Sequence, residues 1–310
     1  MTFDIQHQYS FLNGLQGKIS FNAILADITW FQVGGAAQLM FRPQNPDDLQ
    51  KFLRQKPEEV PLTVIGVGSN LLVRDGGIDG VVVRLGREFN KITKLSATHM
   101  YVGGAVLDSN ISRMALEYGI GGLEFLSGIP GTVGGGVYMN AGCYGREFSD
   151  IVESVDIIGP GGQIKTLPAK EIGFSYRHSN IPTNSIVIGA ILKGIVSDSV
   201  HIQSAIQDIQ QKRLLTQPIR TKTGGSTFAN PDPQLSNGKK AWQLIDEAGC
   251  RGLRRGDAIV SPMHCNFLIN EGKATATDLE DLGEEVRERV LRQSGINLRW
   301  EIQRIGKRLI

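Results

Sequence analysis

A single serine, Ser226, follows two glycines in the stretch KTGGSTFANPDP and precedes Phe228 and Asn230. A hydroxyl presented by flexible backbone in this way can be a turn residue, a nucleophile or a proton donor to a ligand. A nucleophilic serine requires a base, usually histidine, and neither a G-x-S-x-G motif nor a recognisable triad is present. The nucleophile is therefore disfavoured, and the local sequence leaves the turn residue and the proton donor as alternatives.

Three further side chains are candidates to act with such a serine. Arg177, in FSYRHS, is either a solvated surface arginine or a planar clamp for a carboxylate. Glu301, in the closing NLRWEIQRIG, alternates with apolar neighbours, so it faces either solvent or a cleft. His264, in SPMHCNFLIN, precedes an apolar run, where a structural histidine is the more common outcome. Asp, Glu and His do not gather at ligand spacing, and we expect no metal site.

Two glycine-rich blocks are candidates to hold a ligand through the backbone. The first, VIGVGSNLLV, lacks the third glycine and the following helix of a dinucleotide fingerprint. Residues 66–70 are therefore either a plain hairpin turn or a nest of N–H groups for an anion. The second block, residues 127–145, carries seven glycines with Pro130 and Asn140, and we expect neither a regular strand nor a helix there. Together the blocks favour a nucleotide cofactor held without a Rossmann helix.

The composition limits the class of protein. The 310 residues suffice for two domains or one large one, and 33 basic against 31 acidic residues leave a net charge of +2. Without a basic run, a nucleic-acid or anionic-membrane surface has no electrostatic footprint. Three widely spaced cysteines, Cys143, Cys250 and Cys265, favour a reduced chain without disulfides. No secretory signal and no membrane-length apolar stretch is apparent, so we expect a soluble, cytoplasmic protein.

Strands and one helix are expected in the first two thirds of the chain. Residues 60–85 predict short strands separated by glycine turns. Residues 107–118 predict a helix that is capped by Asp108 or Ser109 and ends at Gly119. A hairpin is expected around residues 160–162, followed by a buried strand in SIVIGAILKGIV.

Helices are prominent in the last third. Residues 201–215 are amphipathic, and we place a domain boundary near this segment. AWQLIDEAG predicts a helix that ends at Gly249, and Thr277 with Glu280 forms a capping box for a helix that ends at Gly295. Because both halves mix strands and helices, the sequence predicts an α+β fold.

Eight segments occur in the order known for one enzyme family: TWFQVGG, VIGVGSNLLVRDGG, SGIPGTVGGGVYMNAGCYG, SYR, GGSTFANP, LIDEAGCRG, HCNFLIN and WEIQRIG. From about Thr29 to Gly306 the chain closely resembles the UDP-N-acetylenolpyruvoylglucosamine reductases (MurB). GSNLLV with SGIPGTVGG is typical of the wider flavoprotein superfamily of the vanillyl-alcohol-oxidase/PCMH type. GGSTFANP with the C-terminal glutamate is specific to the MurB family.

The resemblance implies an NADPH-dependent flavoenzyme of peptidoglycan synthesis that reduces UDP-N-acetylglucosamine enolpyruvate to UDP-N-acetylmuramate. Hydride would pass from NADPH to FAD and on to the enolpyruvyl methylene carbon. The resemblance also implies a two-subdomain FAD-binding region over residues 1–200, divided into about 22–87 and 88–200, and a substrate-binding domain over 201–310. The chain lacks the segment that carries a substrate-clamping tyrosine in longer members, so it resembles the shorter, type II form. Because no histidine lies in either glycine block, we expect non-covalent FAD.

The resemblance assigns roles to individual residues. By match to the family's motifs, Ser226 is the proton donor, Arg177 holds the substrate carboxylate and Glu301 helps to stabilise the enolate-like intermediate. Substrate contacts are implied for Tyr176, Asn230 and His264. Cofactor contacts are implied along both glycine blocks, at Gly66, Val67, Gly68, Ser69, Asn70, Ile129, Pro130, Gly131, Thr132, Gly134, Gly135, Asn140, Ala141 and Gly142.

Two other functions remain as alternatives. One is another FAD oxidase of the same superfamily, which would consume oxygen with a simple sugar or hydroxy acid; the specific C-terminal motifs argue against it. The other is a nucleotide-sugar-binding protein without turnover, and the presence of Ser226, Arg177 and Glu301 argues against that. The expected partners are the UDP-sugar and NADPH, with no nucleic acid and no membrane insertion. The sequence does not specify the oligomeric state, for which a monomer is plausible.

Overall fold

The computed structural model describes residues 9–309. The first eight residues, which bear on the expectation of no signal segment, and Ile310 lie outside the described part. The chain divides into two compact units. The first unit comprises the residues up to Phe21, Leu39–Gly66 and Gly80–Gln210, and the second comprises Asn22–Gln38, Val67–Asp79 and Gln211–Ile310. Each unit is therefore assembled from segments that are far apart in the sequence.

The largest sheet of the first unit has five antiparallel strands in the order β12-β11-β13-β7-β6. Its strands are β6 (Ile92–Lys94), β7 (His99–Gly103), β11 (Val152–Ile158), β12 (Ile164–Pro168) and β13 (Ile186–Lys193). The predicted hairpin is confirmed, because Ile158 pairs with Ile164 across the turn between β11 and β12. The predicted buried strand is β13, whose residues from Ile186 to Ala190 are all buried.

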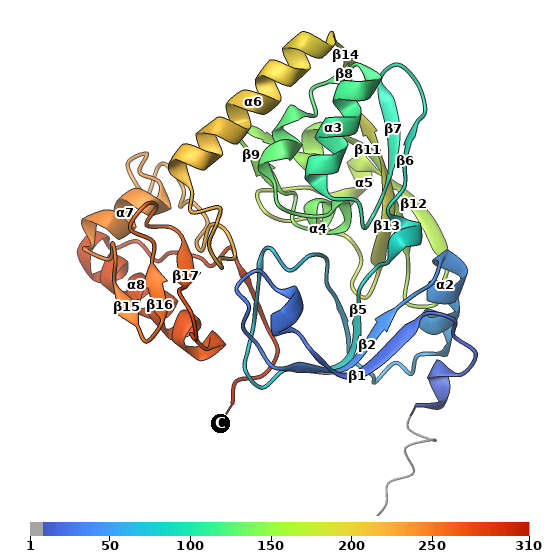
Figure 1. Ribbon diagram of the computed structural model, residues 1–310, viewed down its shortest axis with the longest axis horizontal. Coiled ribbons are helices and arrows are strands. Elements are labelled where there is room, and N and C mark those ends of the chain that lie inside the picture. The colour runs from blue at the N-terminus through green and yellow to red at the C-terminus, as the bar shows by residue number, and fades with distance from the viewer. Residues whose placement is uncertain (1–8, 310) are drawn as a thin grey trace, which may run out of the picture. The chain divides into compact units, whose positions relative to one another are not determined.

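Helices pack against this sheet, as Figure 1 shows. Helix α3 (Asp108–Tyr118) contacts β6, and the short helix α4 (Val133–Tyr138) contacts β7 and β13. The core between them is made of aliphatic and aromatic side chains, among them Val102, Ile111, Val137 and Phe148. The remaining elements of this part are β8 (Ile120–Gly121), η4 (Glu124–Gly128), β9 (Gly142–Cys143), β10 (Arg146–Glu147), η5 (Phe148–Asp150), α5 (Ala169–Ile172), β14 (Ile195–Val196) and α6 (Ser199–Thr216).

A second sheet has four strands in the order β1-β2-β5-β3. The strands are β1 (Lys18–Ile24), β2 (Ala36–Arg42), β3 (Leu62–Val64) and β5 (Ile78–Val83), accompanied by η1 (Ser10–Leu12), η2 (Ala26–Ile28), α2 (Pro46–Gln55) and η3 (Arg87–Phe89). In the first unit, Phe41 and Val83 of this sheet share a core with Leu49 and Phe52 of α2. The strands expected in residues 60–85 are thus present.

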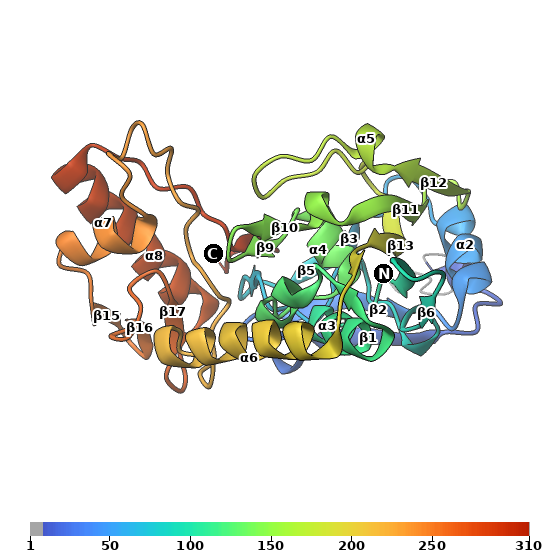
Figure 2. The same ribbon diagram turned by 90° about the horizontal axis from the view of Figure 1, so that it is seen from above.

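The second unit is built around α8 (Ala276–Ser294). Figure 2 shows this helix beside α7 (Ala241–Glu247) and the three short strands of the sheet β15-β16-β17, which it contacts. Those strands are β15 (Arg254–Arg255), β16 (Ala258–Val260) and β17 (Leu268–Asn270). The parallel pair β4 (Leu71–Val73) and β18 (Gln303–Ile305) joins the same unit. The core includes Phe31 and Leu72 together with Leu282, Val286 and Trp300.

The helix ends confirm the predicted stops and correct the predicted starts. Gly119 and Gly295 both end their helices in the left-handed conformation, as expected for C-terminal glycines. Helix α3, however, has Leu107 as its N-cap, and Asp108 is a buried residue of the first turn that caps nothing.

The capping box of α8 is formed two residues upstream of the prediction. Thr275 and Asp278 make the reciprocal bonds. Thr277 instead donates its hydroxyl to Asp75, and Glu280 is buried among arginines of the same unit. Since both residues of the predicted box have tertiary partners, the upstream pair caps the helix.

The expectation of no helix in the second glycine block is wrong. Residues Val133–Tyr138 form α4 although three of the six are glycines. A Cβ at Gly136 would lie 2.3 Å from the ring of Phe148, so the glycine allows this turn of helix to pack directly on an aromatic side chain. Close packing therefore outweighs the low helix propensity of glycine here.

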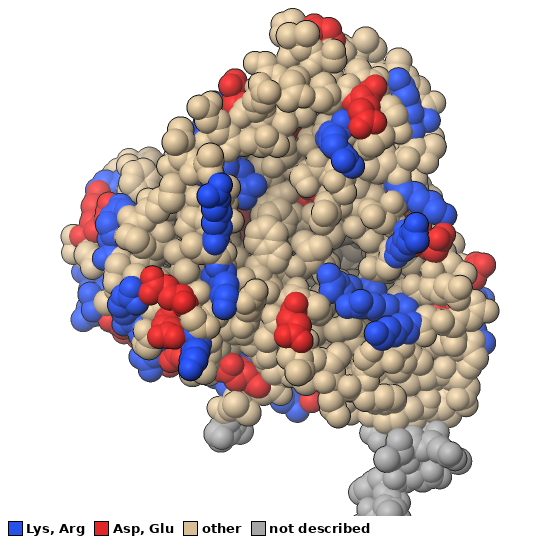
Figure 3. Space-filling view, in the orientation of Figure 1, with Lys and Arg blue, Asp and Glu red and all other residues tan. Residues whose placement is uncertain are grey.

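No helix of the described residues is long and apolar enough to cross a membrane. On the face shown in Figure 3, basic and acidic side chains are mixed over the surface. That distribution agrees with the small net charge of +2.

Candidate active site and cofactor site

The first glycine block forms a turn between β3 and β4 whose N–H groups are open to a ligand. Within residues 9–309, the five consecutive backbone N–H groups of residues 66–70 have no hydrogen-bond acceptor. Successive unpaired N–H groups form a concave anion site, and the neighbouring hydroxyl of Ser69 adds a donor. Of the two readings left open by the sequence, the structure thus favours the anion-binding nest. Its donors fit a pyrophosphate such as that of FAD.

Glycine is required in this turn for a steric reason. Gly68 has φ of +68°, and a Cβ there would lie 2.8 Å from the carbonyl oxygen of Ile28 and 2.9 Å from the Cα of Thr29. The carbonyl oxygen of Gly68 also accepts a hydrogen bond of 3.2 Å from the N–H of Trp30. The turn is therefore held against a neighbouring segment of the second unit by its own backbone.

Within the first unit, Gly66 of the first glycine block adjoins the second block. A Cβ at Gly66 would come within 2.6 Å of the hydroxyl of Thr132, so only glycine allows this approach. The second block is tied to the end of β7 by hydrogen bonds from Val133 to Val106 and from Gly134 to Gly104. Along this block Ile129 is buried, whereas Gly135 is exposed. Gly131, Gly134 and Gly135 thus form a glycine-lined surface beside Gly66, whereas the predicted cofactor residues Ile129, Thr132 and Asn140 are buried.

A buried carboxyl lies directly behind this surface, at Asp108. The residue is fully buried, and neither side-chain oxygen has a hydrogen-bond partner within the described chain. Its backbone N–H donates to Gly131, and a Cβ at Gly131 would lie 2.7 Å from its carboxyl. Burial raises the pKa of Asp108 well above its usual value and so favours the neutral acid. The sequence interpretation as a helix cap missed this environment.

Arg177 lies in a tight turn of the first unit. Its guanidinium donates to the carbonyl oxygens of Gly142, at 2.8 Å, and Asn140, at 3.4 Å, and it lies 4.9 Å from the ring centroid of the exposed Tyr176. Asn140 is completely buried, and its side chain bonds to the backbone of Ser175 and of Ser149. The predicted substrate-carboxylate clamp therefore rests on the end of the second glycine block.

In the second unit, Ser226 and Glu301 lie on neighbouring segments. Ser226 is half-buried and pairs with Phe267 in an isolated bridge, and the next residue, Thr227, accepts a hydrogen bond of 2.8 Å from the N–H of Glu301. Gly225 has φ of +82° with nothing within 4 Å of a Cβ, so it is conformation rather than crowding that requires glycine before the serine. The sequence predicted both residues, and the structure brings their backbones together.

The first glycine block contributes to the same cluster of the second unit. Asn70 donates its side-chain amide to the carbonyl oxygen of Glu301 at 3.2 Å, and its own carbonyl oxygen accepts from Gln303 at 3.0 Å. Three segments separated by more than 70 residues in the sequence therefore meet: the end of the nest, the serine loop and the strand that carries Glu301. We name these three segments the serine cluster.

Two other predicted substrate residues belong to the second unit. Asn230 is exposed, and its side-chain oxygen accepts a hydrogen bond of 3.1 Å from the N–H of Ala241 at the start of α7. His264 packs edge-on against Phe267 at 4.9 Å, and its Nδ1 accepts from the N–H of Asn266. Burial lowers the pKa of His264, which favours the neutral ring with its proton on Nε2.

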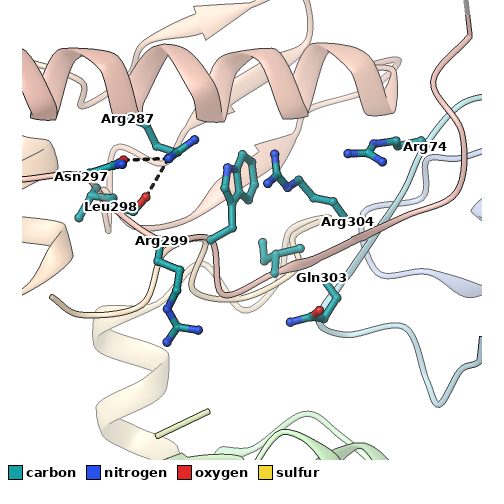
Figure 4. Close-up of a pocket in the computed structure, with 9 residues that line it drawn as sticks. Arg74, Arg287, Asn297, Leu298, Arg299, Gln303 and Arg304 are labelled. Carbon is teal, nitrogen blue, oxygen red and sulfur yellow. Dashed lines mark hydrogen bonds between the residues drawn. The ribbon is translucent and has the colours of Figure 1, made fainter. Parts of the chain in front are cut away.

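The second unit has a hollow of about 470 Å³. Several arginines line it, as Figure 4 shows. Arg74 makes two hydrogen bonds of 2.9 Å to the buried carboxylate of Glu280, and Arg304 donates to both Glu280 and Glu284. Arg299 points to the opposite side of the closing segment from Arg304. These paired guanidiniums tie β4 and β18 to α8, so we assign this hollow a structural role. No group of three potential metal ligands occurs within the residues that the structure describes.

The comparisons with known proteins agree with this arrangement. An FAD binding domain model matches residues 37–168, which include both glycine blocks, and the model of the UDP-N-acetylenolpyruvoylglucosamine reductase C-terminal domain matches residues 217–305. The chain is 51% identical to the UDP-N-acetylenolpyruvoylglucosamine reductase of Gluconobacter oxydans over 96% of this chain and 95% of that protein. It is 48% identical to that of Rickettsia canadensis, over 94% and 97%.

A solved structure shows the same fold. The crystal structure of the enzyme from Thermus caldophilus (MurB) superposes with a TM-score of 0.80 at 33% identity, over 94% of this chain and 100% of that one. The fold and the glycine-lined surface define an α+β flavoprotein with an FAD-binding domain. More particularly, the chain belongs to the UDP-N-acetylenolpyruvoylglucosamine reductase family.

Proposed function

We propose that this chain reduces UDP-N-acetylglucosamine enolpyruvate to UDP-N-acetylmuramate with NADPH, in the cytoplasmic synthesis of peptidoglycan precursors. Family membership over nearly the whole chain supports this function. The observation that carries it is the serine cluster, because it joins the nest, Ser226 and Glu301 through main-chain and side-chain hydrogen bonds. The reaction requires a cofactor that accepts hydride from NADPH and passes it to the substrate, and a group that donates a proton.

The residues of both glycine blocks fit FAD. The unpaired N–H groups of residues 66–70 would hold its pyrophosphate, and the surface of residues 129–135 would lie along the rest of the nucleotide. When bound, FAD supplies hydride transfer between NADPH and the methylene carbon of the enolpyruvyl group. The chain offers no histidine in either block, so the cofactor is held without a covalent bond.

Ser226 would then donate a proton to the carbon that bears the substrate carboxylate. Negative charge develops on that carbon as hydride reaches its neighbour, and the carbanionic centre is basic enough to take a proton from a hydroxyl held in place. The left-handed Gly225 and the bridge to Phe267 fix the backbone on both sides of the serine. Unchanged reoxidation of the flavin in a Ser226→Ala variant would remove the serine from the mechanism.

Arg177 and Glu301 would stabilise the same charge. The planar guanidinium of Arg177 matches a carboxylate and polarises it. A carboxyl group stabilises developing negative charge only as a hydrogen-bond donor, so the role of Glu301 requires its protonated form. Tyr176, Asn230 and His264 would contact the sugar nucleotide.

The domain assignment follows from these roles. Residues 1–200 would form the FAD-binding region, with subdomains at about 22–87 and 88–200, and residues 201–310 would form the substrate-binding domain. The length of 310 residues fits the shorter, type II form of the family.

Steady-state turnover tests the proposal. NADPH should be consumed only when UDP-N-acetylglucosamine enolpyruvate is present, and one UDP-N-acetylmuramate should form for each NADPH consumed. Oxygen consumption with a simple sugar or hydroxy acid would instead identify an oxidase. Binding of the sugar nucleotide without turnover would identify a silent binding protein.

A further inference from the structure

Asn140 occupies a junction in the first unit that its sequence context does not reveal. The residue lies between α4 and β9, is fully buried and has φ of +42°. Its side-chain oxygen accepts a hydrogen bond of 2.9 Å from the N–H of Ser149, and its amide nitrogen donates to the carbonyl oxygen of Ser175 at 3.0 Å. Both ends of the amide are thus committed to the protein backbone.

The second of these bonds reaches the turn that carries Arg177. Ser175 and His178 exchange two backbone hydrogen bonds of 3.0 Å, so Tyr176 and Arg177 are the central residues of a tight turn. Arg177 has φ of +58°, which is uncommon for a residue with a side chain and places its Cα at a fixed and strained point. The Ser175 carbonyl that Asn140 holds is therefore at the base of this turn.

The guanidinium of Arg177 is held by the same junction. The carbonyl oxygens of Asn140 and Gly142 accept from Nη1 and Nη2, at 3.4 Å and 2.8 Å. The orientation of these carbonyls depends on the left-handed backbone at Asn140, because that residue sets the direction of the chain into β9. One residue thus determines both the position of the turn and the direction of the guanidinium.

We infer that Asn140 is the positioning residue for Arg177, and that its side chain acts on the substrate only through that arginine. The inference rests on the role proposed above for Arg177. It assigns the Asn140 amide to the backbone of the SYR turn, because the side chain is fully buried and both its oxygen and its nitrogen are already bonded to the backbone of Ser149 and Ser175. A neutral amide suits the junction, since it offers one acceptor and one donor at once.

The test is the Asn140→Gly variant, in which glycine keeps the left-handed backbone while the amide is removed. FAD affinity and flavin reduction by NADPH should stay within about twofold of wild type. Reoxidation of the flavin by UDP-N-acetylglucosamine enolpyruvate should slow by about 10- to 100-fold, the effect of a misplaced positioning group. The matched control is Asn184→Gly, because Asn184 is also left-handed in the first unit, at φ of +59°, but is exposed.

A double-mutant cycle separates positioning from an independent role. In an Arg177→Ala background, Asn140→Gly should cause no further loss in the rate of reoxidation, and a full additional loss would overturn the inference. A fall in FAD affinity in Asn140→Gly, with Asn184→Gly unchanged, would overturn it in favour of a cofactor contact. If Arg177→Ala alone leaves reoxidation unchanged, the proposed role of Arg177 fails and the inference falls with it.

A second variant covers the case in which Asn140→Gly does not fold. Asn140→Asp keeps the size of the side chain and the acceptor for Ser149, but it cannot donate to the Ser175 carbonyl when ionised. The same selective slowing of reoxidation is expected. Wild-type reoxidation in this variant would contradict the inference.

Discussion

The glycine-lined surface of the first unit is formed mainly by backbone atoms, whereas the serine cluster of the second unit depends on side chains. Around the glycine blocks, backbone N–H groups and missing side chains form the surface, and the buried carboxyl behind it, Asp108, has no hydrogen-bond partner among residues 9–309. In the second unit side chains dominate, and its buried carboxyl, Glu280, is paired with Arg74, Arg304 and Arg308. The first arrangement suits a large nucleotide, and the second suits the precise placement of a few groups.

The contrast teaches how each region tolerates change. A surface made of backbone is sensitive to any added Cβ, whereas a cluster made of side chains is sensitive to their removal. The two buried carboxyls show the same difference in their charge. The hydrogen bonds of Arg74 lower the pKa of Glu280 and favour its ionised form, whereas burial raises the pKa of Asp108 and favours its neutral form.

The largest effect is expected from Ser226→Ala. Removal of the proton donor should slow reoxidation of the flavin by the enolpyruvyl substrate by about 10²- to 10⁴-fold and leave reduction by NADPH unchanged. Stopped-flow absorbance of the flavin measures both half-reactions. The control is Thr223→Val, which removes a buried hydroxyl without a hydrogen-bond partner three residues upstream. If both variants slow reoxidation equally, the loop as a whole, rather than the serine hydroxyl, is responsible.

Gly68→Ala addresses the backbone side of the comparison. The added Cβ would meet two backbone atoms, at 2.8 Å and 2.9 Å, so the turn must shift. A loss of about 1.4 kcal/mol in the binding free energy lowers the affinity for FAD about tenfold. We expect the shifted turn to lower the affinity by at least this factor. Equilibrium titration of apoprotein with FAD gives the affinity.

The matched control for this variant is Gly238→Ala. Gly238 has φ of +76° but nothing within 4 Å of its Cβ, so this change imposes the left-handed strain without the crowding. Only the free energy of unfolding should fall, by about 1–2 kcal/mol. An equal loss of FAD affinity in both variants would show that the nest does not hold the cofactor.

Glu280→Gln tests the paired carboxyl. Removal of the buried carboxylate leaves the partly buried guanidiniums uncompensated, and since Arg74 and Arg304 are about a quarter exposed, we expect a loss of about 2 kcal/mol in the free energy of unfolding. The folded-state pKa is depressed below the ordinary 4.5, so this stabilisation is present above pH 4.5 and is lost as the pH falls through the folded-state pKa. Denaturant unfolding at several pH values should therefore show that the free energies of unfolding of the wild type and of Glu280→Gln converge in acid.

The matched comparison for this variant is Glu88→Gln, which breaks an exposed pair with Lys91. No measurable loss of stability is expected there. A loss as large as that of Glu280→Gln would contradict the importance given to burial.

Asp108→Asn tests the buried carboxyl that has no hydrogen-bond partner among the described residues. At low pH we expect this variant to change the free energy of unfolding least. The folded-state pKa lies well above the ordinary 3.8, so wild-type stability should fall as the pH rises from 3.8 to that pKa, by about 1.4 kcal/mol per unit. Asparagine resembles the neutral acid and does not titrate, so the variant should lack this slope. Identical pH profiles of the free energy of unfolding would show that Asp108 does not titrate as described.

Much of this organisation could be predicted because local chemistry sets it. Gly119 and Gly295 end their helices as the sequence indicates, since few other residues adopt the left-handed conformation easily. The alternation of the closing segment also holds, with Leu298, Trp300 and Ile302 buried. Ser226 and Glu301 could each be singled out because each lies in a local motif, whereas the bond that makes their segments adjacent joins Glu301 to the distant Thr227.

The missed features all depend on distant partners. The capping box of α8 is formed by Thr275 because Glu280 is engaged by arginines from β18 and from the segment after β4. The helix α4 exists because Phe148 packs on Gly136. Neither partner can be read from the neighbouring sequence. The junction at Asn140 is of the same kind, since its partners lie 9 and 35 residues away.

The most direct test of the central claim is the visible absorption spectrum of the purified protein under anaerobic conditions. Flavin bands should bleach when NADPH is added and return only when UDP-N-acetylglucosamine enolpyruvate follows. This result would demonstrate both half-reactions in one sample. A colourless protein that takes up no added FAD would contradict the cofactor assignment and, with it, the mechanism.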